Sequence, residues 1–128
     1  KSQPENAKQL IMFVDDEVML VTMAQEMLEF VGYEVAVRTS SIEALEAFRA
    51  QPDKFDLVIT DKTMPQMTGF DLAKELRGIR PDIPIILCTG FSETIETEMA
   101  KAMSINAYIM KPLAMQELAT SVRKVLDK

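Results

Sequence analysis

Five polar side chains stand where apolar runs of the sequence end. Asp15 and Asp16 follow one run, Asp61 closes a second, and Thr89 and Lys111 follow two more. Three neighbouring carboxylates repel one another and stay ionised together only around a cation. Oxygen ligands without histidine or cysteine favour Mg²⁺ or Mn²⁺ over zinc. A lysine and a hydroxyl could hold phosphoryl oxygens there, while a central carboxylate acts as the nucleophile that forms an acyl phosphate.

Each of these signals is weak by itself. An Asp pair after a strand usually caps a helix, and Thr-Gly or Lys-Pro usually marks a turn. The signals gain weight together, because the carboxyl ends of parallel strands meet at one edge of a sheet, where ligands bind.

The elements that would bring these residues together alternate along the chain. Short apolar segments predict strands at Leu10–Val14, Glu34–Val37, Phe55–Thr60, Ile83–Thr89 and Ala107–Met110. Amphipathic segments predict helices at Glu17–Val31, after the capping pairs Ser40/Glu43 and Thr68/Asp71, after Ser92 with Ile95, Met99 and Met103, and at Met115–Leu126. This alternation predicts a parallel sheet with helices on both faces. The methionines Met19, Met23 and Met27 are expected to pack in the core.

Composition narrows the function. The 128 residues fit one domain, and their net charge of −6 gives no support to direct nucleic acid binding. The absence of histidine excludes His-dependent triads and a phosphohistidine on this chain. The lone Cys88, in an apolar run, is expected to be a buried thiol in a reducing, cytoplasmic compartment. No run is long enough to insert in a membrane. Residues 1–8 are expected to be a linker or disordered tail of a longer protein, and residues 9–128 one domain.

From about Gln9 to Leu126 the sequence resembles the receiver domains of bacterial response regulators and of hybrid histidine kinases in two-component signalling. The resemblance rests on Phe13–Glu17, Asp61–Gly69, Thr89-Gly90 and Lys111-Pro112. It implies a flavodoxin-like (βα)5 fold, a doubly wound parallel sheet with strand order 2-1-3-4-5. In receiver domains the peptide bond at this Lys-Pro position is often cis, so the resemblance implies a cis bond between Lys111 and Pro112.

The resemblance implies a role for each site residue. Asp61 would accept the phosphoryl group, Lys111 would pair with it, and Thr89 would be the switch hydroxyl. Tyr108 would be the aromatic that changes rotamer with Thr89. The ligands of Mg²⁺ or Mn²⁺ would be Asp16, Asp61, the main-chain carbonyl of Thr63, and Asp15 through a water.

The implied partner is a histidine kinase or a histidine phosphotransfer domain, which supplies the phosphoryl group. Phosphorylation would reshape the face formed by the fourth helix, fifth strand and fifth helix, through which the domain could form a homodimer. Such a domain is not an enzyme by itself beyond the gain and loss of its own phosphoryl group, although the parent chain could be a hybrid histidine kinase. The bulk of Phe91 near the phosphoryl group predicts slow to moderate self-dephosphorylation.

Three alternatives remain open at this point. A haloacid-dehalogenase-like phosphatase would need a second Asp two residues beyond the nucleophile, where this chain has Thr63. A flavodoxin-like binding module would need a phosphate-binding loop after the first strand, where Asp15-Asp16-Glu17 stands. A degenerate receiver used only for protein contacts would not need the intact set of acids, hydroxyl and lysine.

Overall fold

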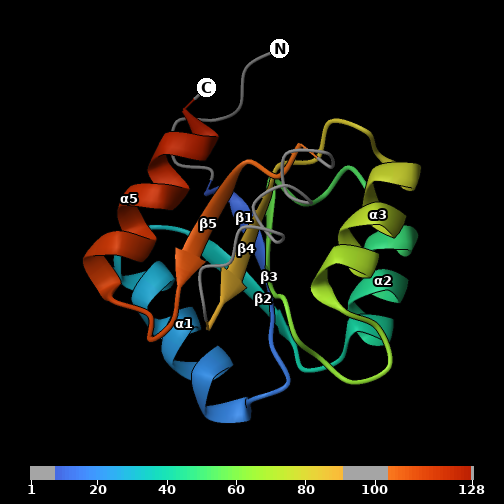
Figure 1. Cartoon of the computed structure of the whole chain (residues 1–128). Helices are drawn as coiled ribbons and strands as arrows, with labels where there is room; N and C mark the ends of the chain where they lie inside the picture. Colours follow the sequence, from blue (N-terminus) through green and yellow to red (C-terminus); the bar gives the residue numbers. More distant parts are fainter. Residues whose placement is uncertain (1–7, 91–103, 128) are drawn as a thin grey trace.

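The protein folds as a five-stranded parallel sheet between two layers of helices (Figure 1). The computed structural model describes residues 8–90 and 104–127. The elements in those ranges are β1 (Leu10–Val14), α1 (Val18–Phe30), β2 (Glu34–Arg38), α2 (Ser41–Ala50), β3 (Leu57–Asp61), α3 (Gly69–Ile79), β4 (Ile85–Thr89), β5 (Ala107–Met110) and α5 (Met115–Leu126). The strand order is β2-β1-β3-β4-β5 and every neighbouring pair is parallel, as predicted.

The sheet separates two apolar cores. Alternate residues of a strand point to opposite faces, so Ile11 and Phe13 of β1 face one core while Met12 and Val14 face the other. The helices α1 and α5 cover the first face, and α2 and α3 cover the second (Figure 1). Because both faces are covered, the central strands are apolar up to their carboxyl ends, and the sequence therefore shows them as short apolar runs.

Local signals set the ends of several elements. The side chains of Ser40 and Thr68 accept hydrogen bonds from the main-chain N–H groups of Glu43 and Asp71, which confirms both predicted caps. Gly32, just beyond α1, has a φ of +109°, a left-handed conformation that favours glycine. The strands β3 and β4 begin two residues later than predicted. The predicted helix after Ser92 lies outside the described residues, as does Phe91.

The prediction of a core position is wrong for Met19 and Met23 of α1 and is confirmed in part for Met27. Met19 is 85% exposed and Met23 is 38% exposed, while Met27 is partly buried. Four residues advance about 400° around a helix, so a stripe at that spacing turns about 40° at each step. The three methionines therefore rotate from the solvent side toward the core, whose centre on α1 is formed by Val21, Ala24 and Leu28. Within the described residues, no helix is long and apolar enough to cross a membrane.

Candidate functional site: an acidic cluster paired with a lysine

The predicted site residues converge at the carboxyl edge of the sheet. Asp61 and Thr89 are the last residues of β3 and β4, and Asp15 and Lys111 directly follow β1 and β5. Main-chain hydrogen bonds extend the sheet at these ends, because the N–H of Lys62 donates to Cys88 and the N–H of Lys111 donates to Thr89, each at 2.8 Å. The backbone that carries Asp61 and Lys111 is thereby held against β4.

Three carboxylates form a cluster at this edge. One oxygen from each of Asp15, Asp16 and Asp61 lies within 4.8 Å of the other two. Asp15 is 1% exposed and Asp61 is 7% exposed, whereas Asp16 is exposed. Asp15 is held in place because its Oδ1 accepts a hydrogen bond of 2.9 Å from the N–H of Glu17. The cluster is therefore buried at Asp15 and Asp61 and open to solvent at Asp16.

Lys111 supplies the positive charge of the site. Its Nζ lies 2.9 Å from Asp15 Oδ2 and 3.0 Å from Asp61 Oδ1. Asp15 Oδ2 is buried and, among the described groups, receives no hydrogen bond of good geometry, so the first of these contacts is an ion pair. Burial disfavours the charged ammonium, but its close contacts with the two carboxylates, and their negative charges, outweigh that effect and raise the pKa of Lys111. The lysine therefore stays cationic at neutral pH.

The surroundings of Asp61 disfavour its negative charge. Burial raises the pKa of Asp61, and the charges of Asp15 and Asp16 raise it further, against the opposing effect of Lys111. Among the ion pairs of the described residues, one ammonium, that of Lys111, serves a cluster of three carboxylates, which leaves an excess of negative charge at its open side. The donor set fits a hard divalent cation, because it offers carboxylate oxygens near solvent and contains neither histidine nor thiolate.

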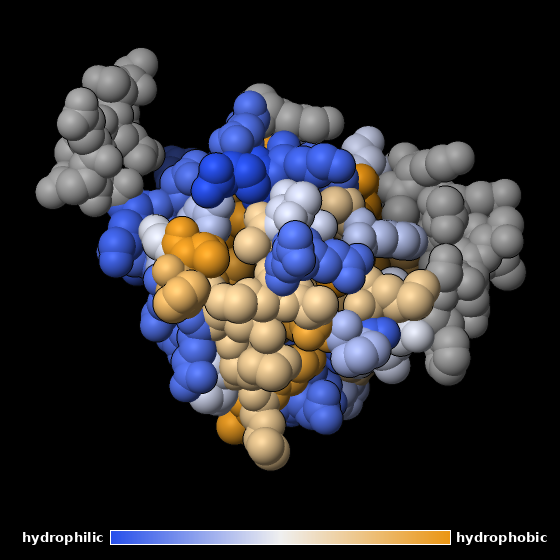
Figure 2. Space-filling model, turned by 90° about the vertical axis from the view of Figure 1, so that its left-hand side faces the viewer, coloured by the Kyte–Doolittle hydropathy of each residue, from blue (hydrophilic) through white to orange (hydrophobic). Residues whose placement is uncertain are grey.

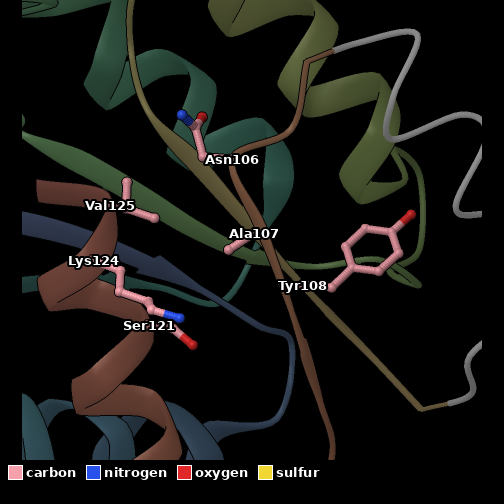
Figure 3. A pocket seen from close by; sticks show the side chains of 6 residues that line it. All are labelled: Asn106, Ala107, Tyr108, Ser121, Lys124 and Val125. Carbon is pink, nitrogen blue, oxygen red and sulfur yellow. The ribbon is translucent and has the colours of Figure 1, made fainter. Parts of the chain in front are cut away.

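Thr89 and Tyr108 lie on one face of the sheet. Tyr108 pairs with Leu87 in the β4–β5 register, and Leu87 is two residues before Thr89, so all three side chains share a face. Thr89 is 3% exposed, and the half-buried Tyr108 packs against the core under α2 and α3. Figure 3 shows the Tyr108 ring on the side of β5 away from Ser121 of α5. This arrangement places the predicted switch pair together on the face opposite α5.

The loop from Asp61 to α3 contains features that sequence reasoning missed. A Cβ at Gly69 would overlap the main-chain carbonyl oxygen of Asp61, so α3 can begin this close to the acid only with glycine. The N–H of Gly69 donates to the carbonyl of Lys62 at 2.8 Å and closes the loop. Thr63 is exposed within this loop, two residues beyond Asp61. The Thr68-Gly69 pair was the available signal, because a cap followed by glycine marks a tight helix start.

Two further expectations concern the surroundings of the site. Cys88 pairs with Asp61 in the β3–β4 register and is buried, as predicted. Burial raises the pKa of its thiol to about 12. The Lys111-Pro112 peptide bond is cis, as the resemblance implied.

Comparisons with known proteins agree on one family. The model of the response regulator receiver domain matches residues 11–123. A probable transcriptional regulator, ycf27 of Pyropia yezoensis, is 34% identical over 97% of this chain and 50% of its own length. The sensor kinase CckA of Brucella abortus is 32% identical over 92% of this chain and 12% of its own length. The chain thus spans about half or less of these curated relatives.

Solved structures agree with the family match. A response regulator receiver domain protein from Clostridium thermocellum has a TM-score of 0.88 and 29% identity, covering 93% of this chain and 94% of its own. The chemotaxis protein CheY4 of Vibrio cholerae has a TM-score of 0.86 and 30% identity, covering 94% and 100%. None of these matches supports the haloacid-dehalogenase alternative. With its strand order, its acidic edge and these relatives, the chain belongs to the response regulator receiver domains of two-component signalling.

Proposed function

We propose that this domain accepts a phosphoryl group on Asp61 from a phosphohistidine of a partner protein. One observation carries the proposal: Lys111 lies 3.0 Å from Asp61 Oδ1 inside a cluster of three carboxylates that is open to solvent at Asp16. A carboxylate paired with a fixed ammonium at an open, acidic edge can receive a transferred phosphoryl group.

In the proposed step, a carboxylate oxygen of Asp61 attacks the phosphorus atom of the phosphohistidine. A P–O bond forms while the P–N bond breaks, and the departing imidazole keeps the electron pair and takes a proton from solvent. Lys111 holds an oxygen of the transferred group and stays close to its starting position. Water later attacks the acyl phosphate, which returns Asp61 to its carboxylate form and releases inorganic phosphate.

We assign the cation site to Mg²⁺ or Mn²⁺. Asp16, Asp61 and the main-chain carbonyl of Thr63 would bind it directly, and Asp15 would act through a water. When bound, the cation offsets the charge of the carboxylates and of the incoming phosphoryl oxygens. The open position of Asp16 supports this assignment, because Mg²⁺ retains several waters.

Thr89 and Tyr108 form the proposed switch. The hydroxyl of Thr89 would move toward the phosphoryl group, and Tyr108, on the same face of the sheet, would change rotamer with it. These movements would shift the equilibrium between two conformations of one face of the domain. That face is made by β5, α5 and the helix predicted within residues 91–103. The same face is where we place homodimer formation.

A partner that carries phosphohistidine would dock next to the acidic cluster. Figure 2, seen from the side of α1 and α5, shows a band of apolar side chains across this surface. Val18 and Met19, in the first turn of α1, are exposed apolar residues on this helix. A hollow between α1 and the β5–α5 loop is lined by Glu17, Leu20, Met23, Gly90, Lys111, Pro112 and Leu113. Met23 lines this hollow together with Lys111, and its flexible side chain supports docking of a histidine kinase or phosphotransfer domain there.

The remaining assignments concern context. We place the receiver domain at residues 9–128 and treat residues 1–8 as a linker. We propose a cytoplasmic domain that binds proteins rather than nucleic acid and has no catalytic turnover of its own beyond the cycle on Asp61. A hybrid histidine kinase is one kind of longer protein that could contain this domain.

The test is phosphorylation by a small acyl-phosphate donor with and without Mg²⁺, followed by intact mass. Wild type and Asp53→Asn, which changes an exposed turn acid, should each gain one phosphoryl group when Mg²⁺ is present. Asp61→Asn should gain none. Labelling of Asp61→Asn to the wild-type level, or an unlabelled wild type, would refute the proposal.

A further inference from the structure

A buried hydroxyl from α2 reaches the loop that follows Asp61. Ser41 is the first residue of α2 and is 2% exposed. Its Oγ donates a 2.8 Å hydrogen bond to the main-chain carbonyl of Met67 and lies 3.6 Å from Met64 Sδ. Met64 and Met67 lie 23 and 26 positions further along the chain, so these contacts exist only because α2 packs beside the loop.

This contact anchors the middle of the loop, whose two ends are held in other ways. At its start, the N–H of Lys62 donates to Cys88, and the carbonyl of Lys62 accepts from Gly69. Between these ends, Met64 is buried in the core under α2 and α3. Gln66 has a φ of 73°, which is uncommon for a residue with a side chain. A segment that includes such a conformation keeps it only where its surroundings hold it in place.

Thr63 lies between the held start of the loop and the buried Met64. The position of its main-chain carbonyl therefore depends on how firmly residues 64–67 are fixed. Among the described residues, Ser41 is the residue whose side chain hydrogen-bonds to this stretch, and it is buried where water cannot easily replace it.

We propose that Ser41 is a positioning residue for the cation site, which it serves by fixing the loop that presents the Thr63 carbonyl. The inference rests on the proposed function, because it assumes that this carbonyl binds the cation. The hydrogen bonds of Ser41 go to Met67 and Met64 and, among the described residues, not to the acidic cluster, so Ser41 acts through the loop. Groups that orient a metal ligand typically change metal affinity by about ten- to a hundredfold when they are removed.

The chain supplies a matched control in the neighbouring serine. Ser40 caps α2 by accepting a 3.3 Å hydrogen bond from the N–H of Glu43 and, in the part of the chain that the structure describes, makes no hydrogen bond to the loop. Ser40→Ala should destabilise α2 and leave the loop in place, whereas Ser41→Ala should leave the cap in place and release the loop. The two variants therefore separate an effect on helix stability from an effect on the site.

Two measurements test the proposal. Calorimetric titration with MgCl₂ should give a dissociation constant about tenfold higher for Ser41→Ala than for wild type, while that of Ser40→Ala stays within about twofold. Hydrogen–deuterium exchange of metal-free protein should show faster exchange of residues 62–68 in Ser41→Ala only. Ser41→Thr, which keeps a hydroxyl, should recover part of the affinity.

The outcomes are distinguishable. Equal Mg²⁺ affinity and equal loop exchange in wild type and Ser41→Ala would overturn the role of Ser41, as would equal weakening by both alanine variants. A wild type that binds no Mg²⁺ would instead refute the proposed cation site. If Ser41→Ala does not fold, Ser41→Cys, with its weaker S–H donor, takes its place in the same comparison.

Discussion

Neutralising Asp16 should stabilise the metal-free protein although it damages the proposed cation site. Asp16 Oδ lies no more than 4.8 Å from a carboxylate oxygen of Asp15 and of Asp61. At that distance two like charges repel by about 0.9 kcal/mol even in the dielectric of bulk water. Salt reduces this repulsion by roughly half, so relief from both neighbours amounts to about 1 kcal/mol in Asp16→Asn.

Asp16→Asn loses few favourable interactions that could offset this gain in stability. Among the described residues, the ion pairs of the cluster join Lys111 to Asp15 and Asp61, so Asp16→Asn breaks no ion pair. Since Asp16 is exposed, the isosteric amide leaves no cavity and no buried unsatisfied group.

Mg²⁺ should act in the opposite direction. A cation at roughly a hundred times its dissociation constant stabilises the wild type by about 2.7 kcal/mol. Asp16→Asn lacks one proposed direct ligand and should gain less. The advantage of the variant in EDTA should therefore shrink or reverse as Mg²⁺ is added.

The assay is urea unfolding followed by far-UV circular dichroism, in EDTA and in a series of MgCl₂ concentrations. Glu46→Gln removes one exposed negative charge on α2, away from the cluster, and controls for net charge. The reasoning fails if Asp16→Asn is no more stable than Glu46→Gln in EDTA. It also fails if Mg²⁺ stabilises Asp16→Asn as much as wild type.

Three further predictions concern Gly69, Cys88 and Met19. Gly69→Ala should lower the free energy of unfolding by more than about 2 kcal/mol, because the new Cβ would overlap the Asp61 carbonyl oxygen. Gly78→Ala, which has open space around it in α3, should raise the free energy of unfolding by about 0.5–1 kcal/mol. Urea unfolding of both variants measures these changes, and equal effects would contradict the overlap at Gly69. The folded thiol of Cys88 has its pKa raised from 9.0 to about 12, so the neutral thiol stabilises the fold below pH 9 and that contribution is lost as pH rises toward 12. The stability difference between wild type and Cys88→Ala should then shrink by up to about 1.4 kcal/mol per pH unit between pH 9 and 11, and a constant difference would speak against a buried thiol. Met19→Lys should slow phosphotransfer from a phosphohistidine protein about fivefold, a loss of ~1 kcal/mol, without changing transfer from a small donor. Phe30→Lys, an equally exposed change at the other end of α1, should change neither rate, and equal slowing by both would argue against docking near Lys111.

Local sequence signals determined most of the architecture. Unbroken apolar runs such as Ile85–Cys88 predicted strands because burial on both faces of a sheet removes the need for polar residues. Ser40 and Thr68 predicted helix starts because a hydroxyl next to free N–H groups is a local interaction. The order of the apolar runs also placed Asp61 and Lys111 at strand ends, before any distance between them was known.

Tertiary packing decided what separate segments do to one another. The sequence did not predict that Lys111 would contact both Asp15 and Asp61, because that contact depends on how β1, β3 and β5 are spaced across the sheet. It also misplaced Met19, since the direction of a helix face is set by where the helix lies on the sheet rather than by spacing alone.

Ser41 and Gly69 show the same limit at the site itself. A serine one residue inside a helix carries no sign of a distant loop, and a glycine at a helix start carries no sign of the carbonyl that it approaches. Both contacts form only when α2 and α3 pack side by side around the end of β3. The sequence thus determined which residues gather at the carboxyl edge, and the packing of distant segments determined how each of them is held there.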